Sequence, residues 1–299
     1  MIIVNIKNGL GNQMFQYAFG KVLEWKYSCP VYFDLMRNNI SQPLKCDLDI
    51  FNIETIHEAD ISVINTFKPF SIRRYRDNNQ YLYYIYFKLR KKFQSNKLIT
   101  ESHPSIFIPT FNKIKLNTNY YFLGHWMNFD YYKAYIDRLR DLYTLKDDTF
   151  YNTGKALEII SSQYQTVSIH IRRGDYLTCG FMANLSLDYY TQAINKIANK
   201  IPNIYIYLFT DDPKWARENF KTNFPYEIVE ANQGNNCYKD IVLMSLCRHN
   251  IIANSSFSWW SAFLNKNPNA LIIAPKNWYN YPTQNRYVNN MIPHTWFRI

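Results

Sequence analysis

The stretch VSIHIRRGDY, residues 167–176, decides the fold of this chain. An apolar, β-branched run ends in two arginines, a glycine and an aspartate, which predicts a buried strand whose carboxyl end delivers charge to a sheet edge. Guanidinium groups stay protonated, and their planar forks match phosphate oxygens. The stretch is therefore compatible with a phosphate site at Arg172 and Arg173. The alternative is an ion pair between one arginine and Asp175, with the other arginine in solvent.

Buried strands and amphipathic helices alternate around this stretch. Strands are expected over 204–209, 226–229, 251–253 and 271–274, and helices over 153–164, 187–200 and 238–247. Pro213 suits the first turn of a further helix, which makes Asp212 its predicted cap. Asp211 is then free to reach a nucleoside hydroxyl or a base edge.

A second phosphate-capable point follows the strand expected at 251–253. Asn254, Ser255, Ser256 and Phe257 come where that strand ends and a helix begins. Serine hydroxyls and backbone N–H groups at a helix N-terminus favour an anion.

A third such point lies near the start of the chain. A strand over 2–7 is followed by a turn with Gly9 and Gly11, a helix over 13–27 and a strand over 31–34 that ends in Asp34. This pattern resembles a dinucleotide-binding fingerprint, but Met14 occupies the third glycine position, where it would obstruct close packing of helix on strand. An NAD-type oxidoreductase therefore remains only a minor alternative.

The three points come from both halves of the chain, as a cleft between two Rossmann-like domains would require. We expect one domain over 1–150, with a last helix over 131–145 and a polar break at 146–148, and a second over 151–299. The Pro-, Asn- and Trp-rich tail from 275 is predicted to return to the first domain. The ligand expected is a nucleotide, held without an evident metal site.

Composition narrows the class of protein. No apolar run reaches membrane-spanning length, and the N-terminus lacks the basic region of a signal peptide. Five scattered cysteines suit reduced thiols in the cytoplasm. Residues 67–97 carry nine basic side chains and one acidic one, together with several tyrosines. This segment is either a solvated face or a basic module on an anionic membrane surface, for which we expect the inner leaflet.

These motifs also resemble a known family. The run from Gly9 to Ala18, the hexapeptide His170–Asp175, the stretch 209–212 and the stretch 254–260 are similar in order and spacing to bacterial α-1,2-fucosyltransferases of glycosyltransferase family 11. The hexapeptide matches the H-x-R-R-x-D motif of GDP-fucose-using transferases. The resemblance implies a GT-B fold, in which two Rossmann-like domains face each other across the active site.

The resemblance also implies an activity. L-Fucose would pass from GDP-β-L-fucose to the 2-hydroxyl of a terminal galactose in a glycan, with inversion and without a metal or other cofactor. The partners would be this donor and acceptor, and no nucleic acid. The donor would be bound mainly by the C-terminal half.

Residue roles follow from the matched positions. The catalytic candidates are Arg172 as the phosphate-stabilising group, Asp175 and Asn12. The expected substrate-binding residues are Gly9, Gly11, Asn12, Gln13, His170, Arg172, Arg173, Asp211, Asn254, Ser255, Ser256 and Phe257. His170 is equally compatible with a hydrogen-bonded core position, because it stands within an apolar strand.

The base that deprotonates the acceptor stays open. Neighbouring arginines lower the pKa of a carboxyl group, so Asp175 is better suited to ion pairing than to proton abstraction. The other candidates, which also form the candidate acceptor site together with Trp126, are His125 and Asp130. His125 stands where the family pattern Gly-Tyr-Trp has a tyrosine, and the segment 181–185 lacks the family's His-Gly, so both departures concern acceptor preference.

Overall fold

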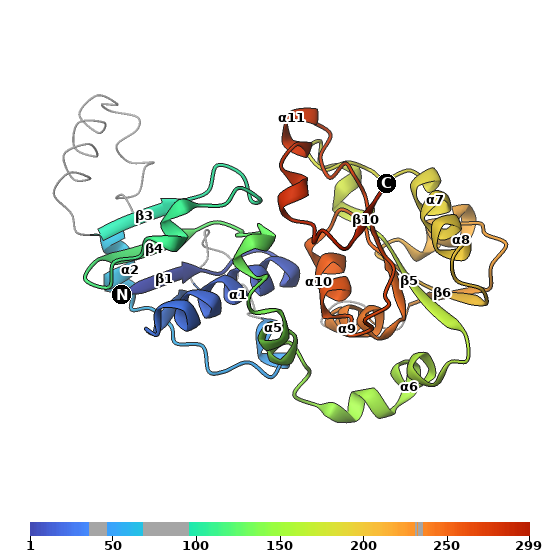
Figure 1. Cartoon of the computed structure of the whole chain (residues 1–299), viewed down its shortest axis with the longest axis horizontal. Helices are drawn as coiled ribbons and strands as arrows, with labels where there is room; N and C mark the ends of the chain where they lie inside the picture. The colour runs from blue at the N-terminus through green and yellow to red at the C-terminus, as the bar shows by residue number, and fades with distance from the viewer. Residues whose placement is uncertain (36–46, 68–95, 231, 233–235) are drawn as a thin grey trace. The chain divides into compact units, whose positions relative to one another are not determined.

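The computed structural model describes residues 1–35, 47–67, 96–230, 232 and 236–299. The chain forms two compact units (Figure 1). The first comprises Met1–Asp47 and Ile53–Tyr135, and the second comprises Leu48–Asn52 and Ile136–Ile299.

The first unit is built on a four-stranded parallel sheet in the order β2-β1-β4-β3. Its strands are β1 (Ile2–Asn5), β2 (Val31–Asp34), β3 (Asn96–Thr100) and β4 (Asn119–Leu123), and its described helices are α1 (Leu10–Tyr27) and α2 (Ile61–Phe67). Ile2 is opposite Val31 on one side and Tyr120 on the other, so β1 and β4 end side by side. Parallel strands align their carboxyl ends at one edge, where ligands of open α/β sheets bind.

Aromatic packing fixes α1 against the segment that follows β4. Phe19 stacks on Trp126 with ring centroids 4.5 Å apart and meets Phe122 edge-on at 5.3 Å. Gly20 is required on the same helix, because a Cβ there would lie 2.5 Å from the ring of Phe33. A separate cluster that includes Ile3 and Tyr121 packs with α2. The sheet therefore buries apolar side chains against both helices.

The second unit contains a six-stranded parallel sheet in the order β10-β9-β8-β5-β6-β7. The strands are β5 (Gln165–Ile171), β6 (Ile204–Thr210), β7 (Tyr226–Val229), β8 (His249–Ile251), β9 (Ile272–Ala274) and β10 (Phe297–Arg298). The helices are α5 (Ile136–Leu142), α6 (Gly154–Ser161), α7 (Leu187–Ala198), α8 (Pro213–Asn219), α9 (Tyr238–Leu246), α10 (Ser256–Leu264) and α11 (Pro282–Asn285).

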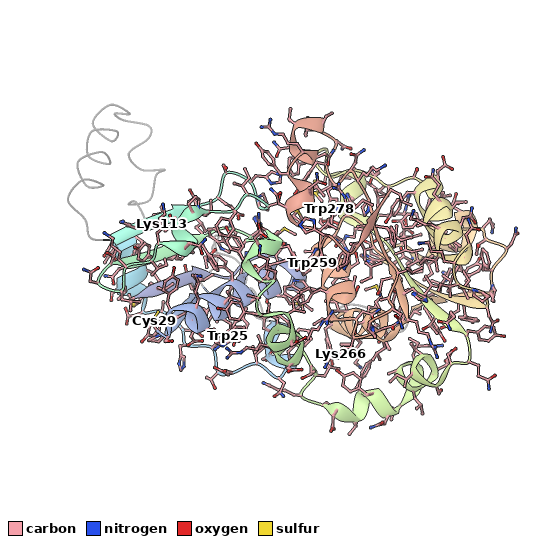
Figure 2. All side chains as sticks on the ribbon, viewed as in Figure 1. Trp25, Cys29, Lys113, Trp259, Lys266 and Trp278 are labelled. Atoms are coloured by element: carbon pink, nitrogen blue, oxygen red, sulfur yellow. The ribbon has the colours of Figure 1, made fainter. Side chains whose placement is uncertain are left out.

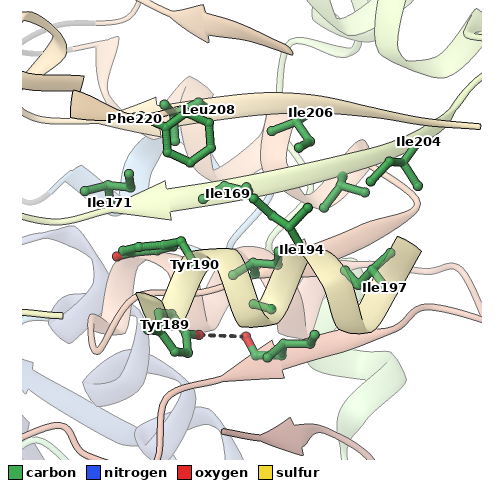
Figure 3. Packing of buried hydrophobic residues seen from close by; sticks show 14 of the residues in the cluster. Ile169, Ile171, Tyr189, Tyr190, Ile194, Ile197, Ile204, Ile206, Leu208 and Phe220 are labelled. Atoms are coloured by element: carbon green, nitrogen blue, oxygen red, sulfur yellow. Dashed lines mark hydrogen bonds between the residues drawn. The ribbon is translucent and has the colours of Figure 1, made fainter. Parts of the chain in front are cut away.

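Side chains of β5 and β6 alternate between the two faces of the sheet, and helices cover each face, so the second unit has three layers. Ile169 and Leu208 belong to the cluster on the face covered by α7, which also contains Ile194 of that helix (Figure 3). Phe209 points to the opposite face, where it packs with Leu243 of α9. Since successive side chains of a strand alternate between its faces, a strand buried on both faces is nearly all apolar. Because β5 lies between β8 and β6, its carboxyl end is central in the sheet.

Several expectations need correction or lie outside the description. The helix expected over 131–145 is a 3₁₀ turn at Phe129–Tyr131 followed by the shorter α5. The end of the tail lies in the second sheet, where β10 pairs with β9. The basic segment falls almost wholly on 68–95, outside the described residues. Within the described ranges, no helix has the length and apolar character needed to cross a membrane.

Candidate functional site

Arg172 lies just past β5 and is held by two carboxylates. Its Nη2 donates to Asp175 Oδ1 at 2.6 Å, and its Nη1 lies 2.9 Å from Asp211 Oδ2. The guanidinium side chain is 34% exposed, whereas that of Asp175 is 67% exposed. A guanidinium has five N–H donors, so donors remain for an anion, and the exposed Asp175 can give way to it.

Asp211, at the end of β6, also fixes the backbone after β5. Its Oδ1 accepts from the backbone N of Arg173 at 2.8 Å. A Cβ at Gly174 would lie 2.7 Å from Asp211 Oδ2, so the carboxylate packs directly on this glycine. The role expected for Asp211 was contact with a nucleoside. In the structure its oxygens are bonded to the two arginines, which makes it an organiser of the arginine pair.

Arg173 is held by neighbours on α8. Its Nε donates to Asp212 Oδ2 at 3.2 Å, and its guanidinium lies 3.7 Å from the ring centroid of Trp215. Asp212 caps α8 by accepting from the backbone N of Trp215, as the sequence predicts. Arg173 is thus oriented by an ion pair and by stacking on an aromatic face. No sequence pattern indicated that Trp215 would stack on Arg173.

His170 is a buried histidine on the α10 side of β5. Its ring lies 5.6 Å from that of Phe257, and its Nδ1 is buried without a hydrogen-bond partner. Burial, together with the charge of Arg172, lowers the pKa of His170 to about 3. The imidazole is therefore neutral at physiological pH. His170 is a buried residue of β5 that lies two positions before Arg172.

A pH dependence of stability follows from His170. Between about pH 6.5 and pH 3 the unfolded chain holds a proton that the folded chain lacks, so the free energy of unfolding falls as the pH falls through this window, by up to about 1.4 kcal/mol per pH unit. We expect His170→Asn to show a shallower decline than wild type in urea denaturation from pH 6.5 to 4. Parallel curves for the two proteins would contradict this prediction.

The residues after β8 join this arrangement through Tyr176. The Tyr176 hydroxyl donates to the backbone oxygen of Asn254 at 3.1 Å. Asn254 is buried, and its Nδ2 donates to the backbone oxygens of Ala183 and Trp278, both at 2.8 Å. Ser255 caps α10 by accepting from the backbone N of Phe257. The hydrogen bonds of the Asn254 side chain are thus made within the protein. Tyr176, which bonds to the residue before Ser255, also lies 5.5 Å from the guanidinium of Arg172, and it therefore links the start of α10 to the arginine.

The glycine turn of the first unit lies at the carboxyl end of β1. Gly9 is the N-cap of α1, and its backbone oxygen accepts from the backbone N of Asn12 and of Gln13, at 2.9 and 3.1 Å. Gly11 is buried and Asn12 is partly buried. The Gln13 side chain is buried and donates to the backbone oxygen of Asn8 at 2.9 Å. The turn is therefore anchored by its own helix.

Asp34 lies at the adjacent end of β2 but is wholly buried. Its Oδ2 accepts from the Tyr121 hydroxyl and from Asn5 Nδ2. An acid that binds a ribose must face the ligand. Asp34 instead belongs to a buried polar cluster, and Met14 beside the turn is also fully buried.

The three candidate acceptor residues occupy different environments. The side chain of His125 is 30% exposed and contacts Glu101, which lies directly after β3. Trp126 is fully buried and packs on Phe19, so its ring has no exposed face. The side chain of Asp130 is 53% exposed and pairs with Lys133 at 2.8 Å. Sequence patterns gave no indication of Glu101, because its partner is 24 positions away.

Each unit therefore gathers part of the predicted set at its own sheet edge. The second brings together Arg172, Arg173, Asp175, Asp211 and the residues after β8, and the first brings together the glycine turn and His125. Among the described residues, no three His, Cys, Asp or Glu side chains form a group that could hold a metal ion.

Comparison with known proteins decides the family. The family model described as glycosyl transferase family 11 matches residues 1–299. This chain belongs to glycosyl transferase family 11. The glycosyltransferase is 29% identical to the O-antigen biosynthesis glycosyltransferase WbnK of Escherichia coli, over 92% of this chain and 93% of the relative. It is 27% identical to an α-1,2-colitosyltransferase of Escherichia coli, over 100% and 99%.

Two solved structures resemble the glycosyltransferase in fold. NodZ α-1,6-fucosyltransferase soaked with GDP-fucose gives a TM-score of 0.50 at 14% identity, covering 88% of this chain and 91% of NodZ. A mutant of Arabidopsis thaliana FUT1 in complex with GDP gives 0.51 at 11% identity, covering 91% and 70%. These likenesses, with the two parallel sheets, confirm the predicted α/β fold of GT-B type.

Proposed function

We propose that this glycosyltransferase is an inverting, metal-independent α-1,2-fucosyltransferase that uses GDP-β-L-fucose. The match of the family over the whole chain carries the proposal. Matched relatives include a galactoside 2-α-L-fucosyltransferase of Caenorhabditis elegans, 31% identical over 33% of this chain. The acceptor would be the 2-hydroxyl of a terminal galactose, and the C-terminal domain would bind the donor.

The residues after β5 supply the chemistry that such a transfer needs. Breaking the bond between fucose and phosphate leaves an oxocarbenium-like sugar and a charged GDP. Fixed donors aimed at the departing phosphate stabilise that charge. We assign this role to Arg172, whose orientation is set by Asp211, with Arg173 and the N-terminus of α10 as further donors.

Colitosyl transfer is a second candidate, which the full-length likeness to an α-1,2-colitosyltransferase favours. Both reactions would join an activated sugar to a 2-hydroxyl, so the arginine pair would act in the same way in each. The two candidates differ only in the sugar that is transferred.

The deciding experiment compares both donors with one acceptor. Purified protein is incubated in EDTA with lactose and either GDP-fucose or nucleotide-activated colitose, and the product linkage is read by NMR. We expect fucose on the galactose 2-hydroxyl in the presence of EDTA. Transfer of colitose alone would replace the first candidate with the second, and transfer that stops in EDTA would contradict the metal-independent mechanism.

A further inference from the structure

Glu101 is a nearly buried carboxylate at the carboxyl edge of the first sheet. Its side chain is 6% exposed. Its Oε1 accepts from the backbone N and from Nδ1 of His125, the latter at 3.1 Å, and its Oε2 accepts from the backbone N of Trp126 at 3.0 Å. A Cβ at Gly124 would lie 2.7 Å from the Glu101 carboxyl carbon, so this acid packs directly on a glycine. The carboxylate is therefore satisfied by three N–H donors.

The partners of the two ring nitrogens of His125 indicate which nitrogen carries the proton in the neutral imidazole. Nδ1 faces a carboxylate, which only accepts, so Nδ1 bears the hydrogen. Nε2 faces Asn8 Nδ2 at 3.0 Å, and an amide nitrogen only donates, so Nε2 presents its lone pair. With its side chain 30% exposed, His125 holds a base atom at the surface of the unit.

The surrounding backbone holds this geometry. The fully buried side chain of Gln16 accepts from the backbone N of Lys7 at 2.8 Å and donates to the backbone oxygen of Gly124 at 3.0 Å, which ties the segments after β1 and β4 together. Asn8 and Trp126 have φ of +68° and +58°, a region that costs energy for bulky side chains. Such strain persists where the surrounding structure enforces it, and it often marks functional sites.

We propose that Glu101 and His125 form an acid–histidine dyad that deprotonates the acceptor hydroxyl. The hydroxyl would displace the Asn8 amide and give its proton to Nε2. Its oxygen then bonds to the anomeric carbon of the donor sugar, and the electrons of the broken carbon–oxygen bond leave with the nucleoside diphosphate. Glu101 balances the charge of the imidazolium, which later releases its proton to water. This role rests on the proposed glycosyl transfer but applies to either sugar.

The test uses full-length variants with whichever donor the wild type transfers. His125→Asn leaves both backbone bonds to Glu101 in place, so the variant should fold. We expect its kcat to fall about 10²–10⁴-fold, the range for general base catalysis, with donor KM and GDP affinity unchanged. Added imidazole should restore activity to His125→Ala. Glu101→Gln should lower kcat about tenfold or more at unchanged donor KM, because it disturbs the tautomer. His57→Asn, at an exposed histidine of the same unit, is the matched control.

Three outcomes would overturn the dyad. They are a kcat of His125→Asn within threefold of wild type, a loss of GDP binding together with transfer, and failure of imidazole to revive His125→Ala. The proposed donor fails separately. If wild type transfers colitose and not fucose, fucosyl transfer is excluded, and the same variants assayed with colitose still decide the dyad.

Discussion

Arg172→Ala should lower kcat for sugar transfer about 10²–10³-fold, the loss typical of removing one donor to developing negative charge. The guanidinium lies between Asp175 and Asp211. Without it, the two carboxylates would face the departing diphosphate with no cation between them, so GDP affinity should also fall. Steady-state kinetics with the preferred donor, and calorimetric titration with GDP, measure the two effects.

Two further variants separate charge from geometry. Arg172→Lys keeps the charge but not the planar fork, so it cannot bond both carboxylates and orient a phosphate together, and we expect an intermediate loss. The matched control is Arg217→Ala on α8, since Arg217 is an exposed arginine paired with Glu230. Its kcat should stay within about twofold of wild type, because surface ion pairs contribute little. An equal loss in Arg172→Ala and Arg217→Ala would refute the assignment.

Trp259→Ala should lower the free energy of unfolding by about 3–5 kcal/mol, the usual cost of removing a large buried aromatic. Trp259, labelled in Figure 2, lies on α10 and is fully buried. It stacks on Phe263 with centroids 5.1 Å apart, contacts Trp260 and Trp296, and donates from Nε1 to the backbone oxygen of Met291 at 2.9 Å. Urea denaturation followed by circular dichroism measures the effect.

Matched variants divide the contribution of Trp259 into packing and hydrogen bonding. Trp259→Phe keeps a six-membered aromatic ring but leaves the Met291 carbonyl without its donor. This loss should lower the free energy of unfolding by about 1–3 kcal/mol. Tyr281→Ala removes a side chain that is 54% exposed and should change stability little. Because α10 begins at the site, Trp259→Ala should also weaken GDP binding. A variant as stable as wild type would show that the neighbouring aromatics refill the space.

Local sequence patterns identified most elements of the second unit. The β-branched run before Arg172 predicted β5, and Pro213 after two aspartates predicted α8 with Asp212 as its cap. Such features depend on backbone sterics and on the periodicity of apolar residues, which act between near neighbours in the chain. The helix expected over 131–145 was too long, because apolar periodicity continues through that stretch, although the helix itself covers only Ile136–Leu142.

The sequence by itself determined the α/β class, the arginine pair at a strand end and the helix N-terminus that begins at Ser255. Only the tertiary structure decided which side chains contact one another in each unit. Asp211 bonds to the arginines because β6 pairs with β5, and Glu101 contacts His125 because β3 pairs with β4. Strand order is set by packing of the whole sheet, and no local pattern encodes it. The physical reason is that a carboxylate takes the donors that the fold brings within reach, however far apart they stand in the chain.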